Sequence, residues 1–297
     1  MGLKIKDVKS LNTGEQVDNT YFEKILDTSD EWIRTRTGIK SRYFTEELPS
    51  EMAAELGKLL EFDRDQVKMI IVTSFSNDLI MPSIAGKVHK ELDLPSGCFS
   101  MDLNAACAGF VASMVLDEKY LEEGQEALLI ASEKISSCLD FTDRGTVILF
   151  GDGCAGMVVK KNSKLWVSDE STYGDEDSLL LKKGEFIKMR GQEVFRFACS
   201  KVPESIEKVI TKSGLPLEDI DYVVAHQANV RILDQVAKRT GIAGDKFLKN
   251  IEDHGNTSAA SVPTLVSDYK DRFKDGDKVV FSAFGAGLVV NSILMEW

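Results

Sequence analysis

The feature that most constrains the fold of this chain is an internal duplication at a separation of 152–153 residues. The segment RDQVKMIIVTS is similar to LEDIDYVVAHQ, and GQEALLIASE is similar to GDKVVFSAFG further along the chain. At the same separation NAACAGF, from Asn104, aligns with NTSAASV, from Asn256. Three matches in one order predict two similar halves. We place the halves at residues 1–162 and 163–297.

Short β-branched runs alternate with amphipathic stretches, several of which are followed directly by glycine, a signal that ends helices. This alternation predicts an α/β fold in which helices cover sheets. The predicted strands are 69–73, 99–103, 128–131, 147–150, 222–225 and 278–282, and the predicted helices are 84–92, 109–123, 194–213, 230–240 and 259–273.

Composition excludes several classes of protein. A net charge of −12 disfavours a general nucleic-acid role, and no apolar run is long enough to span a membrane. Five cysteines without a C-x-x-C pair indicate neither a disulfide framework nor a zinc site. The first ten residues contain no signal-peptide core, so we expect a cytoplasmic protein.

The segment GDGCAG, residues 151–156, satisfies the letters of a dinucleotide-binding fingerprint. A strand-like MVVKK follows it, whereas such a site needs a helix whose N-terminus holds the pyrophosphate. We therefore expect no nicotinamide cofactor.

Cys107 follows a predicted strand and precedes a predicted helix, among alanines and a glycine. A free cysteine is more often a small buried hydrophobe than a nucleophile. A helix N-terminus, however, lowers a thiol pKa, and small neighbours leave room for a substrate.

Two further segments carry candidate hydrogen-bond donors. His226 lies at the end of a predicted strand, where functional groups collect in doubly wound folds, and a neutral imidazole could donate to a developing negative charge. Asn256 is either a helix cap or a second donor beside it. Two glycines flank Ala286 and make either a tight turn or an oxyanion-binding backbone N–H.

Cysteine, histidine and asparagine in this order resemble the β-ketoacyl-[acyl carrier protein] synthase III family of the thiolase superfamily. The segments DTSDEWIRTRTGI, NAACAGF, TDRGT, FGDG, GQEVF, HQANVRI and HGNTSAASVP are all similar to that family. The resemblance implies a thiolase-like five-layered αβαβα fold of two duplicated halves, assembled as a homodimer. It implies no cofactor and no metal, because the CoA thioester is a substrate.

The resemblance also implies a two-step reaction. Cys107 takes an acyl group from acyl-CoA, and malonyl-[acyl carrier protein] then loses CO₂ and attacks that acyl group. His226 and Asn256 stabilise the enolate, and the backbone N–H groups of Cys107 and Ala286 form the oxyanion hole. The product is a 3-oxoacyl-[acyl carrier protein], as in the initiation of type II fatty acid synthesis.

The resemblance also implies which residues contact CoA and the carrier protein. It places the adenine of CoA between Trp32 and Arg144. Contacts to CoA and substrate are implied for Thr28, Trp32, Arg36, Met81, Arg144, Gly191, Phe195, Ala228, Asn229 and Phe284. Contacts to the acidic carrier are implied for Arg196, Gln227, Ala228, Asn229, Val230, Arg231, Lys238 and Arg239, although the last two also fit a merely solvated helix face.

Departures from the family pattern leave the acyl group open. Met81 stands where the family often has the phenylalanine that a dimer partner supplies, and the region 160–189, at the mouth of the site, is short. The alternatives are a starter-loading condensing enzyme of a secondary-metabolite pathway, a cysteine-dependent acyl hydrolase, and a non-enzymatic carrier-protein scaffold.

Overall fold

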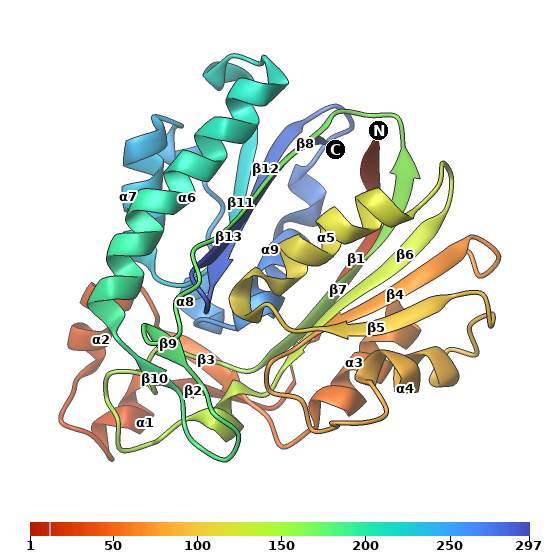
Figure 1. Cartoon of the computed structure of the whole chain (residues 1–297). Helices are drawn as coiled ribbons and strands as arrows, with labels where there is room; N and C mark the ends of the chain where they lie inside the picture. The colour runs from red at the N-terminus through yellow and green to blue at the C-terminus, as the bar shows by residue number, and fades with distance from the viewer. Residues whose placement is uncertain (12) are drawn as a thin grey trace.

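The computed structural model describes residues 1–11 and 13–297, and two sheets dominate it (Figure 1). The first sheet has the strand order β1-β7-β6-β4-β5 and the second has the order β8-β13-β12-β11. Their bounds are β1 Gly2–Leu11, β4 Val67–Thr73, β5 Phe99–Leu103, β6 Glu126–Glu133, β7 Gly153–Asn162, β8 Trp166–Thr172, β11 Tyr222–Ala225, β12 Lys278–Gly285 and β13 Val289–Glu296.

The two sheets repeat one plan, as the duplicated sequence predicts. In the first sheet β1 and β6 both pair antiparallel with β7, and β4 pairs parallel with β6. In the second sheet β8 and β12 both pair antiparallel with β13, and β11 pairs parallel with β12. Even β5, parallel to β4, has a remnant counterpart, because Phe247 forms a parallel bridge to Val223 of β11.

Five layers of helix and sheet follow from the alternation of side chains along the strands. Ile71 of β4 and Phe281 of β12 face a central core that includes residues of α5 (Gly109–Tyr120) and α9 (Ser261–Tyr269). Ile70 faces the opposite way, into a core with α3 (Pro49–Leu59) and α4 (Ile84–Glu91). Val280 faces a third core, with α6 (Gly191–Ser213) and α7 (Val230–Thr240). In Figure 1, α5 and α9 accordingly lie between the two sheets. The predicted αβαβα fold is confirmed.

The predicted strand 147–150 is wrong. Val147, Ile148 and Phe150 are buried, but the segment forms successive turns, and only Phe150 makes a bridge, to Asn256. These side chains enter a fourth apolar cluster, with Phe22 among others. Burial rather than strand pairing explains their apolar character.

Two predicted helices are shorter than expected. The stretch 109–123 ends at Tyr120 because Leu121 turns to an extended conformation and stays buried in the central core. The stretch 259–273 has α9 at its centre, with a 3₁₀ turn on either side. The segment after GDGCAG continues β7, as predicted.

The other β-strands and α-helices lie around one end of the two sheets (Figure 1). They are β2 (Glu15–Asp18), α1 (Asn19–Glu23), α2 (Asp30–Thr37), β3 (Ser41–Phe44), β9 (Leu179–Leu180), β10 (Lys188–Met189) and α8 (Ile251–His254). Among the described residues, no helix combines the length and apolar character needed to cross a membrane.

Candidate active site

Two matching asparagine turns position the candidate catalytic groups. The Oδ1 atom of Asn104 accepts the N–H of Ala106 at 3.2 Å, and Oδ1 of Asn256 accepts the N–H of Ser258 at 2.9 Å. Ala106 and Ser258 both lie in the left-handed region, at φ values of +46° and +53°. Residues with a β-carbon adopt this conformation at a cost of about 1 kcal/mol, and the asparagine hydrogen bonds offset that cost.

Cys107 comes directly after Ala106. It is the middle residue of the 3₁₀ turn Ala106–Ala108, which leads into α5. The thiol is therefore at a helix N-terminus, as the sequence predicts. Its pKa is nevertheless raised to about 12, because burial outweighs the opposing effect of the Ser258 hydroxyl. The prediction of a lowered thiol pKa is not supported by this closed site, which holds the sulfur protonated.

His226 follows β11, and its ring lines the same cavity as Cys107. The ring lies edge-on to Phe284, with 5.5 Å between ring centroids, and Nδ1 is 2.7 Å from Oγ of Ser261. Burial lowers the pKa of His226 to about 3. The imidazole is therefore neutral near pH 7.

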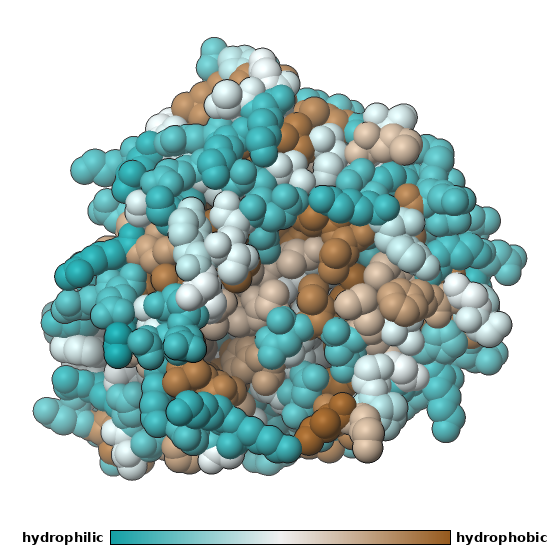
Figure 2. Space-filling model, viewed as in Figure 1, coloured by the Kyte–Doolittle hydropathy of each residue, from teal (hydrophilic) through white to brown (hydrophobic). Residues whose placement is uncertain are grey.

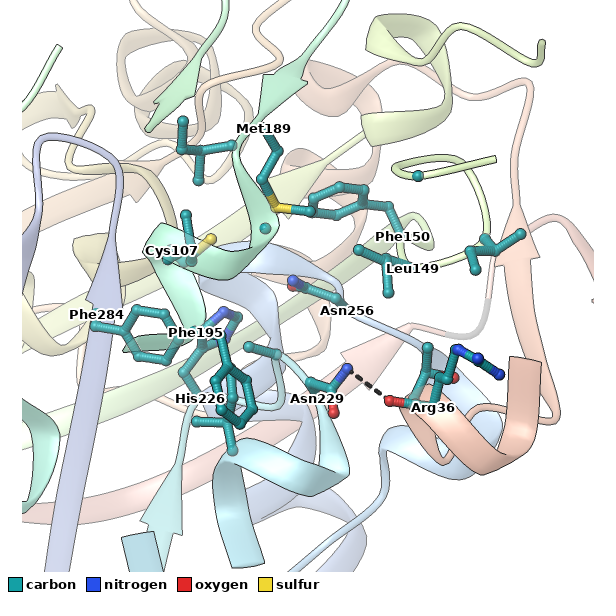
Figure 3. Close-up of a pocket in the computed structure, with 18 of the residues that line it drawn as sticks. Arg36, Cys107, Leu149, Phe150, Met189, Phe195, His226, Asn229, Asn256 and Phe284 are labelled. Carbon is teal, nitrogen blue, oxygen red and sulfur yellow. Dashed lines mark hydrogen bonds between the residues drawn. The ribbon is translucent and has the colours of Figure 1, made fainter. Parts of the chain in front are cut away.

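Asn256 can combine the two roles that the sequence analysis left open, the helix cap and the hydrogen-bond donor beside His226. Its Oδ1 holds the turn through Ser258 N–H, so the amide group must direct its Nδ2 donor elsewhere. The side chain lines the cavity, and Figure 3 shows its amide end on the side of Cys107. Asn256 can thus hydrogen-bond a substrate oxygen there.

The loop after β12 approaches Cys107 through its backbone. A β-carbon added at Gly285 would lie 3.0 Å from the backbone N of Cys107, so only glycine fits without a shift. Ala286 is absent from the residues with positive φ, whereas Gly287 and Leu288 have values of +76° and +50°. Alanine is therefore compatible with position 286, as the oxyanion-hole prediction requires.

Two cavities meet at Cys107. The larger, of about 230 Å³, contains His226 and Asn256 and extends to Trp32. The smaller, of about 160 Å³, has mainly apolar walls. On the face shown in Figure 2, apolar residues line a central depression, and mainly hydrophilic residues surround it. The larger cavity brings together eleven of the predicted residues: Trp32, Arg36, Cys107, Arg144, Gly191, Phe195, His226, Ala228, Asn229, Asn256 and Phe284.

The predicted adenine position is closed in this structure. The guanidinium carbons of Arg36 and Arg144 lie 4.2 and 4.7 Å from the centre of the Trp32 ring. A base can enter between Trp32 and Arg144 only if that arginine moves away. Thr28, predicted nearby, is outside the cavity lining and has a buried hydroxyl without a hydrogen-bond partner among the described residues.

Of two residues predicted to contact substrate, Asn229 lines the larger cavity and Met81 lies outside both cavities. Asn229 caps α7 by accepting the N–H of Arg231, and its Nδ2 donates to the carbonyl of Arg36 at 3.1 Å (Figure 3). Met81 is 85% exposed and lines neither cavity. A role for Met81 in the acyl pocket therefore requires a second chain.

The prediction that Gln227 contacts a carrier protein is wrong. Its side chain is fully buried, and it donates to the carbonyls of Ala225 and Leu248 at 2.8 and 3.3 Å. Its Oε1 accepts the N–H of Asn250 at 3.2 Å. Gln227 therefore fastens the end of β11 to the following loop.

The other predicted carrier-binding residues remain accessible to different degrees. Arg196 and Arg231 are exposed and line a shallow depression with Phe195, and Lys238 and Arg239 are exposed at the end of α7. The half-buried members are Ala228, Asn229 and Val230, the last lying next to Gly38.

Sequence reasoning missed several residues of the site. Ser258 and Ser261 stand in the aligned segment NTSAASV, but neither is predicted to contact a catalytic group. In the structure the Ser258 side chain lies at Cys107 and the Ser261 hydroxyl lies at His226. The apolar walls of the cavities include Leu179, Ile187, Met189 and Leu288, which carry no sequence signal, and Leu149 and Phe150, which the sequence suggests only as part of a strand. Within residues 1–11 and 13–297, no cluster of three His, Cys, Asp or Glu side chains could hold a metal ion.

Comparisons with known proteins agree on one family. The family model "3-Oxoacyl-[acyl-carrier-protein (ACP)] synthase III" matches residues 101–174, and its C-terminal counterpart matches residues 210–297. The β-ketoacyl-[acyl-carrier-protein] synthase III 1 of Halalkalibacterium halodurans is 37% identical, with 95% of this chain and 94% of that protein covered. The β-ketoacyl-[acyl-carrier-protein] synthase III of Acholeplasma laidlawii is also 37% identical, with 99% and 100% covered. The crystal structure of 3-oxoacyl-[acyl-carrier-protein] synthase III from Aquifex aeolicus superposes with a TM-score of 0.94 over both full chains, at 32% identity.

The raised pKa of Cys107 predicts how the free thiol reacts with iodoacetamide. Only the thiolate is alkylated, so the rate should be low at pH 7 and rise about tenfold per pH unit to about pH 10. Intact-mass spectrometry measures the rate at each pH, with Cys107→Ser to subtract modification of other cysteines. A rate that levels off above about pH 8 would show an activated thiolate and contradict this account.

Proposed function

The chain belongs to the 3-oxoacyl-[acyl-carrier-protein] synthase III family, and from this premise we propose that it condenses an acyl-CoA with malonyl-[acyl carrier protein]. The products are a 3-oxoacyl-[acyl carrier protein], CO₂ and CoA. The enzyme is an acyltransferase that starts type II fatty acid synthesis; the CoA thioester is its substrate, and it uses no cofactor.

In the first half-reaction Cys107 attacks the thioester carbonyl of acyl-CoA. A bond forms between the sulfur and the acyl carbon, the bond to the CoA sulfur breaks, and the thiol proton leaves on CoA. The backbone N–H groups of Cys107 and Ala286 hold the transient oxyanion, since a fixed donor acts most strongly where charge develops. The smaller cavity takes the acyl chain, because its walls include Phe75, Leu181 and Ile187.

In the second half-reaction the malonyl group occupies the larger cavity beside the acylated Cys107. The bond to its carboxylate breaks, CO₂ leaves, and the electron pair forms an enolate whose oxygen His226 and Asn256 hydrogen-bond. The enolate carbon attacks the acyl carbon, the bond to Cys107 breaks, and the sulfur takes up a proton that comes from solvent.

One observation carries this proposal: a buried thiol, a neutral buried imidazole and an oriented amide donor line one cavity that opens toward Trp32. A scaffold without catalysis would not need these three groups around a common space. The burial also favours condensation over hydrolysis, because it keeps water from the acyl group.

The test is intact-mass spectrometry after exposure to acetyl-, short branched-, medium-chain and aromatic acyl-CoAs, followed by malonyl-[acyl carrier protein]. We expect an acyl adduct that Cys107→Ser lacks, and its disappearance as 3-oxoacyl-[acyl carrier protein] forms. Absence of any adduct would overturn the proposal.

The same assay separates the alternatives. Strong preference for a long or aromatic acyl group would assign the enzyme to starter loading in a specialised pathway. Discharge of the adduct to free acid, without any condensation product, would indicate a hydrolase.

A basic surface that runs from beside the cavity along α6 and α7 supports docking of the acidic carrier protein on a chain of net charge −12. It consists of Arg196, Arg231, Lys238 and Arg239, all exposed on α6 and α7. Lys238 and Arg239 also lie in the last turn of α7, where positive charge stabilises a helix, so docking and helix stability must be separated by experiment.

Lys238→Glu should raise the KM for malonyl-[acyl carrier protein] about three- to tenfold and leave acylation by acyl-CoA unchanged, because only the carrier meets this surface. Lys90→Glu, an equal charge change at an exposed site on α4, is the matched control. An equal KM for both variants would refute a docking role for Lys238.

We also propose that two chains form a homodimer through the edge of the first sheet. β5 is the last strand of that sheet, and Phe99 and Tyr120 beside it are 51% and 50% exposed with their rings 6.1 Å apart. Ile80 and Met81 are 81% and 85% exposed. Pairing of two β5 strands would cover this edge and these side chains.

Light scattering should give a mass near twice 32.9 kDa, and Phe99→Glu should reduce it to that of one chain. Phe186→Glu is the matched control, since Phe186 is also 51% exposed but lies between β9 and β10. A monomeric wild-type protein would contradict the dimer.

All five cysteines are free, which fits a reducing compartment, and we place the enzyme in the cytoplasm.

A further inference from the structure

Arg42, on β3, is a fully buried arginine that bridges two segments distant from each other in sequence. Its Nη1 donates to Oδ1 of Asn19, the first residue of α1, at 2.8 Å. Its Nη2 donates to the carbonyl of Ile148 at 2.6 Å. The guanidinium carbon lies 4.7 Å from the centre of the Phe22 ring, and Nε has no hydrogen-bond partner among the described residues.

The burial of this cation is costly, because both of its acceptors are neutral. Neutral oxygens and an aromatic face return only part of the hydration free energy that a buried ion loses. Burial lowers the pKa of Arg42 to about 10, so the side chain is still charged near pH 7. An apolar side chain of similar volume can often replace such an ion without loss of stability, so the two directed hydrogen bonds are the feature that needs an explanation.

The segment 148–151, which Arg42 holds at its first carbonyl, is hydrogen-bonded to the backbone of Asn256. The carbonyl of Leu149 accepts the N–H of Asn256 at 2.9 Å. The N–H of Gly151 donates to the carbonyl of Asn256 at 3.1 Å. Both backbone groups of Asn256 are therefore fixed by this one segment.

The stem of Arg42 also packs against both sides of this contact. A β-carbon added at Gly151 would lie 2.8 Å from Cβ of Arg42, and one added at Gly255 would lie 3.2 Å from it. Gly255 directly precedes Asn256 and has a φ of +65°. The two glycines thus leave room for the arginine stem, and a change at position 42 acts on the backbone on either side of the amide donor.

We propose that Arg42 is a positioning residue for the second half-reaction: it holds segment 148–151 against the backbone of Asn256, so that the Asn256 amide donor meets the enolate oxygen. This inference rests on the proposed condensing function. Arg42 lines neither cavity and exchanges no proton. The other asparagine turn positions Cys107, so acylation does not require the arginine.

Arg42→Met is the test variant, because methionine keeps an apolar stem but donates no hydrogen bond. In rapid-mixing measurements, acylation by acyl-CoA should stay within about twofold of the wild-type rate, whereas CO₂ release from malonyl-[acyl carrier protein] should slow about tenfold to 100-fold, the effect of a slightly misplaced group. If Arg42→Met does not fold, Arg42→Gln serves in the same comparisons.

Phe44→Leu is the matched control. Phe44 lies on the same strand as Arg42 and packs against the same apolar cluster, with 6.4 Å between its ring centroid and that of Phe22. The substitution loosens the packing around the arginine but keeps both of its hydrogen bonds. It should lower the Tm and leave the ratio of CO₂ release to acylation unchanged.

Hydrogen exchange measures the positioning without any catalytic step. The backbone N–H groups of Gly151 and Asn256 should exchange at least about tenfold faster in Arg42→Met than in the wild-type protein, when each rate is expressed relative to the N–H groups of β6 in the same chain. This reference removes the effect of a change in global stability. Phe44→Leu should leave both relative rates unchanged.

Each result separates this inference from the proposed function. Unchanged CO₂ release in Arg42→Met, or unchanged relative exchange rates, would overturn the role of Arg42 and leave the condensing function intact. Equal slowing of acylation and CO₂ release would also overturn it, as a general effect on the fold. Failure of the wild-type chain to form any acyl adduct would instead refute the condensing function, and the exchange rates would still decide whether Arg42 holds Asn256.

Discussion

The asparagine turns that follow β5 and precede α9 are the constraint on which the site depends. Each turn holds a non-glycine residue, Ala106 or Ser258, in the left-handed region through one side-chain-to-backbone hydrogen bond. One turn presents Cys107, the proposed nucleophile, and the other presents Asn256, whose amide is the proposed donor. The two turns are thus matching parts of the duplicated halves, and the proposed mechanism gives the residues that they carry different roles.

Burial determines how these groups can act. It keeps the pKa of Cys107 high and that of His226 low, so the resting site holds a thiol and an imidazole rather than an ion pair. A neutral site admits an apolar acyl chain and leaves proton transfer to the reaction itself. In the proposed mechanism fixed donors, among them Asn256 and the backbone around Gly285, stabilise negative charge only as it develops.

Much of the fold and of the site was predictable because the duplication and the motifs are local in sequence. The repeated strands and the positions of Cys107, His226 and Asn256 follow from short segments, and the order of the layers follows from the family resemblance that these segments carry. What could not be predicted depends on tertiary packing. Phe150 looks like part of a strand but is buried by side chains from α1 and α2, and Gln227 looks exposed but fastens β11 to a loop. The Arg144 guanidinium on Trp32 and the raised thiol pKa likewise arise only when distant segments meet.

The central claim is that the turn at Asn256 and the donation by Asn256 are separable functions of one side chain. Asn256→Asp keeps an oxygen to accept Ser258 N–H but removes the Nδ2 donor. Rapid-mixing measurements on this variant, with acylation and CO₂ release followed separately, test the claim most directly. The account predicts acylation near the wild-type rate and CO₂ release slowed at least about 100-fold, the typical effect of losing one such donor. Wild-type CO₂ release, or equal loss of both steps, would contradict it.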